Sequence, residues 1–306
     1  MSRPLKVGVQ LPEVERDVRW PELLDMVRAI EDLGYDSAWF GEHLLYRWPD
    51  RAARGPWEAW GMLAAIAAVT TRVEFGPLVA CTAFHNPAVL AKRADTIDEI
   101  SGGRFILGLG AGWNETEFRA FGIPFDHRID RFEEAFTIIR GLLQDGAVDF
   151  AGTYYQARDC YLLPRGPRAG GPPLMIGSNG ERMLRITAPH VDAWNSWYAD
   201  TRNSPSGVGP LRDRVDAACR AAGREPAEIE RTVAVHVRMP GGKGRTMGST
   251  DPEHDVRPLQ GDPKSMAEEL RGYAREGIGH VQLVIDPIDR AAIEGFAPVL
   301  SLLDGD

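Results

Sequence analysis

The sequence contains little cysteine and little lysine. Its three cysteines are scattered and form no CxxC pair, at Cys81, Cys160 and Cys219. This odd, scattered set predicts reduced thiols rather than a disulfide framework. The lysines are Lys6, Lys92, Lys243 and Lys264. None of them stands at the end of a predicted strand, which argues against a Schiff-base aldolase site.

Long apolar segments and metal-binding patterns are also missing. The N-terminal segment MSRPLKVGVQLPEVERD lacks the apolar core of a secretory signal, and no window approaches the roughly 18 apolar residues of a membrane span. The 7 histidines form neither HxH nor HExxH, so no metal site is expected. The formal net charge of −9 argues against nucleic acid or an anionic membrane as the main partner. We therefore expect a soluble, cytoplasmic protein.

What the sequence does contain is a regular alternation of short apolar runs with amphipathic stretches. Eight strands are predicted, at residues 5–11, 36–41, 72–80, 104–109, 173–177, 191–195, 231–238 and 279–285. Helical patterns between them include Trp20–Gly34, a helix that stops at Gly102 and one that Asp262 caps. Eight alternating units predict an α/β fold of the (β/α)8 TIM barrel type, and a doubly wound open sheet is the alternative.

Composition does not change along the chain, so residues 1–306 are expected to form a single barrel domain. The longest connections are Gly41–Trp57, Ala111–Asp126, Gly146–Pro172 and Met239–Gly261. The first, second and fourth of these are expected as insertions after strands 2, 4 and 7. In such barrels the active site lies at the carboxyl ends of the strands.

Tryptophan gathers where the predicted strands end. Every tryptophan except Trp20 lies at a strand end or in the connection after the second strand. Aromatic walls with few polar groups suit a flat, conjugated ligand. Trp48, Trp57 and Trp197 are therefore candidates for a substrate pocket, and packing within the connection is the alternative for the first two.

Two glycine-containing turns follow predicted strands. In GLGAGW the fourth strand is followed by Gly110, Ala111, Gly112 and Trp113. A dinucleotide fingerprint would need glycine in place of this tryptophan, so we interpret the turn as a close approach of the backbone to a ring. The second turn consists of Gly177, Ser178, Asn179 and Gly180. Its backbone N–H groups favour phosphate, with an ordinary helix cap as the alternative, and the aromatic wall favours a flat cofactor that carries phosphate.

Glu42 and His43 form an acid–base pair at the end of the second strand. Histidine titrates near neutral pH and can exchange a proton with a redox centre. The alternative is a structural histidine that is held by hydrogen bonds in the barrel rim. His85 is interpreted as a helix-capping residue. Cys81 is interpreted as a small buried side chain, because no partner base is evident.

These residues resemble the luciferase-like flavin-dependent oxidoreductase superfamily, in particular its members that use the 5-deazaflavin coenzyme F420. Three segments carry the resemblance: LGYDSAWFGEH, GRFILGLGAGWNETEFRAFGIPF with the following DHRIDRFEEAF, and PLMIGSNGERMLRITAPHVDAWN. The resemblance extends over essentially the whole chain with the motifs in matching order.

The resemblance implies a homodimer of (β/α)8 barrels. The ring of F420, or alternatively of FMN, would lie against a bulge that often contains a non-prolyl cis peptide, here formed by Leu78, Val79, Ala80 and Cys81. The cofactor phosphate would bind the turn at residues 177–180. His43 occupies the position of the catalytic or substrate-proximal histidine. Some F420-dependent dehydrogenases carry an acidic glutamate where this chain has Ala111, so that proton donor is missing here.

The function that the resemblance implies is hydride transfer between C5 of F420 and a small organic substrate. His43 would exchange the proton, and Glu42 would orient His43 or line the pocket. Arg165 and Arg168 are candidates to bind the polyglutamate tail of F420, with solvated surface arginines as the alternative. The first alternative function is an FMN-dependent monooxygenase on the same barrel. The second is a flavin-binding barrel without turnover. A flavin or F420 reductase would serve only as the source of reduced cofactor.

Overall fold

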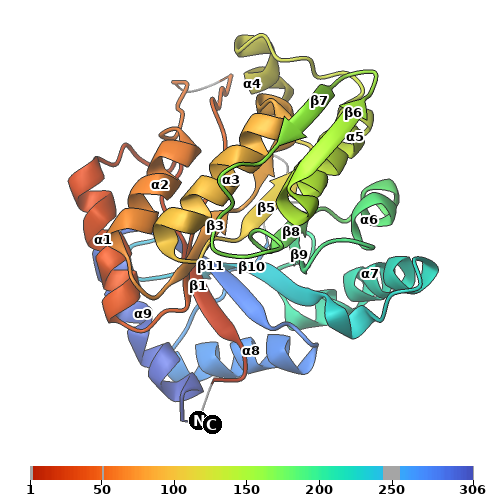
Figure 1. The fold of residues 1–306 in the computed structure, drawn as a ribbon. Coiled ribbons are helices and arrows are strands. Elements are labelled where there is room, and N and C mark those ends of the chain that lie inside the picture. The colour runs from red at the N-terminus through yellow and green to blue at the C-terminus, as the bar shows by residue number, and fades with distance from the viewer. Residues whose placement is uncertain (1–2, 50–51, 244–255, 306) are drawn as a thin grey trace. The chain divides into compact units, whose positions relative to one another are not determined.

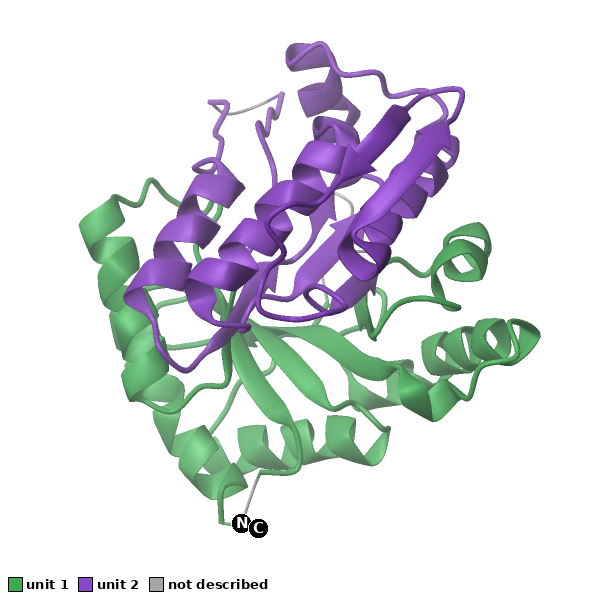
Figure 2. Ribbon diagram, in the orientation of Figure 1, with its two compact units in different colours: residues 1–39, 177–306 green, residues 40–176 purple. Residues whose placement is uncertain are grey.

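The computed structural model describes residues 3–49, 52–243 and 256–305. The chain divides into two compact units (Figure 2). Unit 1 comprises residues 1–39 and 177–306, and unit 2 comprises residues 40–176. The expectation that residues 1–306 form one domain remains a prediction.

Unit 1 is built from parallel strands that alternate with helices along the chain (Figure 1). In order of pairing the strands are β2 (Ser37–Phe40, its last residue in unit 2), β1 (Lys6–Gln10), β11 (His280–Asp286), β10 (Glu230–Arg238) and β9 (Ala193–Ser196). The helices are α1 (Trp20–Asp32), α6 (Glu181–Thr187), α7 (Gly209–Ala221), α8 (Pro263–Arg275) and α9 (Arg290–Leu303). The strands are buried along nearly their whole length, which is typical of parallel sheets.

Unit 2 contains the remaining strands and helices. Its strands are β3 (Glu74–Pro77), β4 (Ala80–Cys81), β5 (Leu107–Gly110), β6 (Ala147–Ala151), β7 (Gln156–Tyr161) and β8 (Leu174–Gly177, its last residue in unit 1). Its helices are α2 (Ala59–Val69), α3 (Pro87–Ser101), α4 (Glu115–Ala120) and α5 (Arg128–Arg140). Strand β5 pairs in parallel with both β4 and β8, whereas β6 and β7 form an antiparallel hairpin.

The local signals for strands and helix ends are confirmed. Each of the eight predicted strands has a counterpart within a few residues of its predicted position. Gly102 ends α3 in the left-handed conformation with φ +68°, as a C-terminal glycine should. The Asp262 carboxylate caps α8 by accepting the backbone N–H groups of Lys264 and Ser265 at 2.9 and 3.1 Å.

Two predicted segments differ from the structure. The connection expected at residues 146–172 contains the β6–β7 hairpin, whose exposed and half-buried residues do not form the continuous apolar run that marks a parallel strand. The strand expected at residues 72–80 is divided into β3 and β4, which are separated by Leu78 and Val79. The Leu78–Val79 peptide is cis, as the resemblance implies for the segment Leu78–Cys81. The insertion expected at residues 239–261 extends beyond the described residues.

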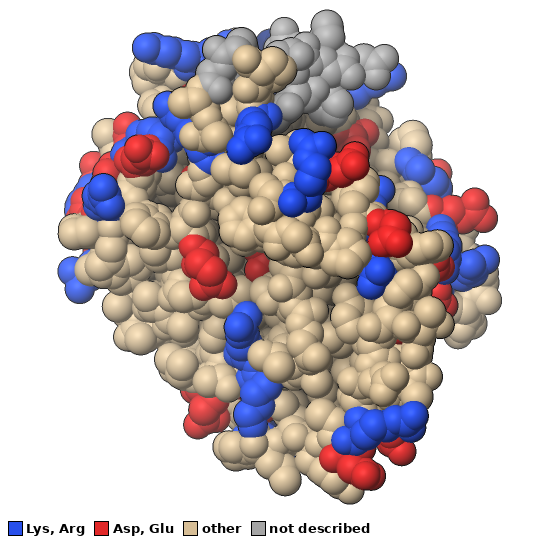
Figure 3. All heavy atoms as spheres, turned by 90° about the horizontal axis from the view of Figure 1, so that it is seen from above, with Lys and Arg blue, Asp and Glu red and all other residues tan. Residues whose placement is uncertain are grey.

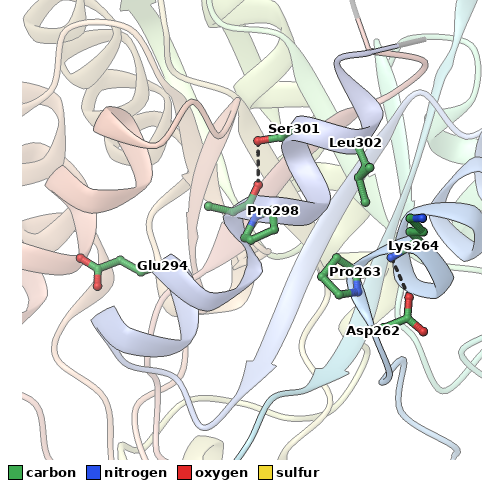
Figure 4. A pocket seen from close by; sticks show the side chains of 8 residues that line it. Asp262, Pro263, Lys264, Glu294, Pro298, Ser301 and Leu302 are labelled. Atoms are coloured by element: carbon green, nitrogen blue, oxygen red, sulfur yellow. Dashed lines mark hydrogen bonds between the residues drawn. The ribbon is translucent and has the colours of Figure 1, made fainter.

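A pocket of about 790 Å³ lies in unit 1 beside α8 and α9 (Figure 4). It is lined by Asp262, Pro263, Lys264, Glu294, Ala297, Pro298, Ser301 and Leu302. None of these is a site residue predicted from the sequence. In the part of the chain that the structure describes, no helix has the combined length and apolar character that crossing a membrane requires.

Candidate functional site

The Glu42 carboxylate is buried, and donors approach both of its oxygens. Oε1 accepts the indole N–H of Trp60 at 2.7 Å and lies 2.8 Å from Nε2 of His85. Oε2 accepts the backbone N–H of Cys81 at 2.7 Å. Glu42 therefore ties the segment that follows β2 to both α2 and β4.

His85 contacts the same oxygen of Glu42 as Trp60 does, and it is itself held by Arg93. Nη1 of Arg93 lies 3.2 Å from Nδ1 of His85. Because a guanidinium only donates, Nδ1 accepts this hydrogen bond, and the ring proton is on Nε2, which donates to Glu42. His85 stands at the C-cap of the one-turn helix η1 (Thr82–Phe84), whereas the side chain that caps α3 is Asn86. The capping interpretation of His85 thus missed its contact with Glu42.

The His43 ring is held by Glu117, a residue of α4 that the sequence analysis did not identify. Nδ1 of His43 lies 2.9 Å from Oε1 of Glu117. Oε2 of Glu117 accepts the backbone N–H groups of Leu44 and Leu45 at 2.8 and 3.3 Å. The Glu117 side chain is 1% exposed and that of His43 is 17% exposed. Both Glu42 oxygens are occupied by other donors, so the orienting carboxylate that the structure gives His43 is Glu117.

The glycine turn after β5 packs against unit 2 itself. Gly112 has φ +77°, and a Cβ placed on it would lie 2.6 Å from Sγ of Cys81 and 2.7 Å from Cζ of Phe118. A Cβ on Gly108 would lie 2.3 Å from the Pro77 carbonyl oxygen. Steric contacts within the protein therefore already exclude side chains at both positions. Contact of this turn with a cofactor ring remains a prediction.

Cys81 has the inert character expected from the sequence. Its side chain is buried at the end of β4, 4% exposed. Burial, with a smaller contribution from the nearby Glu42 carboxylate, raises the pKa of the Cys81 thiol well above its usual range. The thiolate that a nucleophile requires is thus disfavoured, and Cys81 is a packing residue.

The aromatic residues of unit 2 have different environments. Trp48 is buried and stacks on Tyr46 with ring centroids 5.8 Å apart, so it packs within the connection after β2. Trp113 is 57% exposed, and its ring meets the His43 ring edge-on at 5.6 Å. Trp57 is 46% exposed. In unit 1, the ring of Trp197 lies 4.7 Å from that of Tyr198. Among these residues, Trp113 is the exposed ring that borders His43.

The turn at residues 177–180 is held by side chains of unit 1. The Trp194 indole N–H donates to the Ser178 carbonyl at 3.0 Å. Nδ2 of Asn179 donates to Oδ2 of Asp200 at 2.8 Å and to Oγ of Ser196 at 3.1 Å. Oδ1 of Asn179 is buried without a hydrogen-bond partner. The turn therefore presents an acceptor that a hydroxyl or N–H donor of a ligand would satisfy.

Arg165 and Arg168 are engaged within unit 2. Arg168 forms a bidentate ion pair with Asp98, whose side chain is fully buried, and also donates to the Phe105 carbonyl. Arg165 donates to the carbonyls of Leu143 and Ala169 at 2.5 and 2.8 Å. These contacts give both arginines a structural role, because each side chain joins segments of unit 2. They go beyond the interpretation as merely solvated surface arginines, and binding of a polyglutamate tail stays a prediction.

Charged side chains of both signs are interspersed on the face shown in Figure 3. Within the described ranges, no three or more His, Cys, Asp or Glu side chains are grouped as a metal site would require. In unit 2 the candidate site residues are two histidine–carboxylate pairs and the exposed ring of Trp113. In unit 1 they are the polar turn at residues 177–180.

Comparison with protein families and curated proteins gives clear matches. Residues 6–239 match the family described as luciferase-like monooxygenase. The chain is 30% identical over 220 residues to a 5,10-methylenetetrahydromethanopterin reductase from Archaeoglobus fulgidus, covering 72% of this chain and 60% of the relative. It is 34% identical over 173 residues to the pyrimidine monooxygenase RutA from Cronobacter sakazakii, covering 55% of this chain and 50% of the relative. The matches thus span about half to three-fifths of the length of these relatives.

Solved structures match over nearly the whole chain. An F420-dependent secondary alcohol dehydrogenase in complex with an F420–acetone adduct has a TM-score of 0.81 at 20% identity, covering 98% of this chain and 99% of that one. The FMN-bound oxygenating component of a type II Baeyer–Villiger monooxygenase from Pseudomonas putida has a TM-score of 0.76 at 16% identity, covering 98% and 97%. At these identities the likeness shows the fold, which is the parallel α/β barrel of the luciferase-like type. The predicted fold class is confirmed, and the doubly wound alternative is wrong.

Proposed function

Because this chain belongs to the luciferase-like monooxygenase family, we propose that it is an F420-dependent oxidoreductase that transfers a hydride between the deazaflavin and a small organic substrate. The observation that carries the proposal is the His43 ring, which buried Glu117 holds beside the exposed ring of Trp113. A histidine ring whose Nδ1 is held by a carboxylate suits proton exchange. Solved structures with this fold bind F420 in one case and FMN in another, so the choice of F420 follows the resemblance of the sequence motifs.

The residues present fit such a cofactor in two places. In unit 1, the buried acceptor Oδ1 of Asn179 suits a hydroxyl of the sugar-alcohol chain that flavins and deazaflavins share. The backbone N–H groups of Gly177–Gly180 and the Ser178 hydroxyl would hold the phosphate. In unit 2, the bulge Leu78–Cys81 and the turn Gly110–Trp113 would border the ring. When bound, the cofactor supplies the hydride chemistry, and the protein supplies binding, orientation and electrostatics.

The chain's own residues then have separate roles. His43 exchanges a proton with the substrate at Nε2, the ring nitrogen that is not turned to Glu117. Trp113 forms an aromatic wall beside it and excludes water. Glu42 does not exchange a proton, since donors approach both of its oxygens, but it fixes the bulge by holding the Cys81 N–H. These roles require no titrating group at Ala111.

Titration of the purified protein with F420 and, separately, with FMN tests the proposal through cofactor fluorescence. We expect micromolar or tighter binding of F420 and weaker binding of FMN. Asn179→Ala should weaken F420 binding about fivefold, because one buried hydrogen bond contributes on the order of 1 kcal/mol. Asn86→Ala, which removes the cap of α3 in unit 2, is the matched control and should bind F420 as the wild type does. Binding of neither cofactor would overturn the proposal.

An FMN-dependent monooxygenase is the second candidate function. Two observations favour it: Ala111 stands where some F420-dependent dehydrogenases carry a glutamate, and Arg165 and Arg168 are bonded within unit 2. Preferential FMN binding, with oxygen consumption when a flavin reductase supplies reduced cofactor, would establish this candidate. A flavin-binding protein without turnover is the third, and it requires that His43→Ala change no rate.

A further inference from the structure

We propose that Glu117 is the positioning residue of this site and sets which nitrogen of His43 exchanges a proton. The inference rests on the proposed function in one respect only, namely that His43 exchanges a proton with substrate. Glu117 itself would contact neither substrate nor cofactor. It would act through the imidazole ring that it holds.

The Glu117 carboxylate is bonded on both oxygens and fixed to the chain beside His43. One oxygen faces Nδ1 of His43 at 2.9 Å. The other accepts the backbone N–H groups of the next two residues, Leu44 and Leu45, at 2.8 and 3.3 Å. The carboxylate is therefore anchored to the same stretch of backbone that carries the ring.

The arrangement of donors assigns the tautomer of His43. An ionised carboxylate has only acceptors, and the two backbone N–H groups have already placed one oxygen in an accepting role. The oxygen that faces Nδ1 accepts as well, so Nδ1 carries a proton. The neutral ring then has its lone pair on Nε2. The Tyr46 and Trp113 rings, with centroids 4.7 and 5.6 Å from that of His43, restrict rotation of the imidazole.

Nε2 is consequently the atom through which the proton moves. When a substrate is reduced, the Nε2–H bond of the charged ring breaks, its electron pair stays on nitrogen, and the proton goes to the electronegative atom of the substrate. The hydride is supplied by the reduced cofactor. Throughout the step the Nδ1 proton remains between the ring and Glu117, whose negative charge compensates the charge of the doubly protonated ring. In oxidation of a substrate the same proton moves in the opposite direction.

The isosteric variant Glu117→Gln tests this assignment sharply. A glutamine side chain has one acceptor oxygen and one donor nitrogen. The N–H groups of Leu44 and Leu45 can only donate, so the amide oxygen must face them and the amide nitrogen must face Nδ1. Nδ1 then has to accept, and its proton moves to Nε2. The substitution is therefore expected to invert the tautomer without changing the shape of the side chain.

Long-range ¹H–¹⁵N correlation spectra of the ¹⁵N-labelled protein without cofactor report the tautomer directly. The His43 signals are assigned by their loss in His43→Ala. We expect Nδ1–H in the wild type and in Glu117→Asp, which keeps a carboxylate, and Nε2–H in Glu117→Gln. Glu115→Gln, on an exposed residue of the same helix, is the matched control and should leave the spectrum unchanged.

Turnover of the loaded enzyme gives the second readout. Glu117→Gln should lower kcat about a hundredfold or more with little change in KM, because the loss falls on proton transfer. An Nε2–H tautomer in the wild type, or an unchanged tautomer in Glu117→Gln, would overturn the inference. The wild-type and Glu117→Asp spectra decide the matter if Glu117→Gln does not fold. If neither F420 nor FMN binds but the tautomers follow the expected pattern, the proposed function fails and the assignment of Glu117 stands.

Discussion

We expect the free energy of unfolding to fall as the pH drops from about 6.5 toward 3, because of one buried histidine. His280 is the first residue of β11 and is 1% exposed. Its Nε2 lies 2.7 Å from Oγ of Ser37, and that oxygen accepts the indole N–H of Trp39 at 2.7 Å. The Ser37 hydroxyl then has its single proton to donate to Nε2, which suits a neutral ring.

The sign and size of the effect follow from the pKa of His280. Burial, with a smaller contribution from Lys6, lowers this pKa from 6.5 to about 3. Between these pH values the unfolded chain binds a proton that the folded chain does not, so stability rises with pH across the window. The contribution is complete above about pH 6.5 and is lost as the pH falls. It amounts to about 2 kcal/mol between pH 8 and pH 5, and to about 3 kcal/mol by pH 4.

Urea unfolding at a series of pH values from 8 to 5 measures this dependence in a range where most carboxylates remain ionised. His280→Gln is expected to be less stable at pH 8, because the contact with Ser37 changes. Between pH 8 and pH 5, its free energy of unfolding should nevertheless change by about 2 kcal/mol less than that of the wild type. His127→Gln, at a side chain that is 57% exposed, is the control and should keep the wild-type slope. Equal slopes in His280→Gln and the wild type would refute the reasoning.

Two substitutions in unit 2 separate stability from activity. Arg168→Ala should cost about 3 kcal/mol of unfolding free energy, because it leaves the buried Asp98 carboxylate without its ion-pair partner; an unchanged urea midpoint would contradict this. Trp113→Ala should change the free energy of unfolding by no more than about 0.5 kcal/mol, since the residue is 57% exposed, while the KM for substrate rises. Steady-state kinetics would disprove the wall role of Trp113 if KM stayed at the wild-type value.

The parts of the fold that the sequence predicts are those with strong local signals. The buried strands β1, β10 and β11 are short and rich in valine, and such segments are recognisable without knowledge of the neighbouring strands. The caps at Gly102 and Asp262 depend on the backbone preferences of single residues. The β6–β7 hairpin lacks such a signal, because nearly all residues of its strands are exposed or half-buried.

The functional contacts that the sequence does not predict join residues far apart in the chain. Glu117 is 74 positions from His43, and Arg168 is 70 positions from Asp98. Helix α4 has six residues, which is too few for a periodic pattern to show that Glu117 faces inward. The one local hint that Glu117 is buried is its position directly before Phe118, which is an apolar residue and is fully buried. Only the folded chain shows which of its many acidic residues meets the histidine.

Glu42 and His43 show why adjacency in sequence is a poor guide to an acid–base pair. Neighbouring side chains of an extended segment project to opposite sides, so two such residues rarely hold each other. The observed partners follow this rule: Glu42 meets Trp60, His85 and the Cys81 N–H, whereas His43 meets Glu117. A carboxylate with every oxygen occupied by fixed donors is suited to hold the bulge in place. A ring anchored at one nitrogen is suited to exchange protons at the other. The motif Glu42-His43 thus contributes one structural anchor and one candidate catalytic residue, and each depends on a partner supplied by a distant part of unit 2.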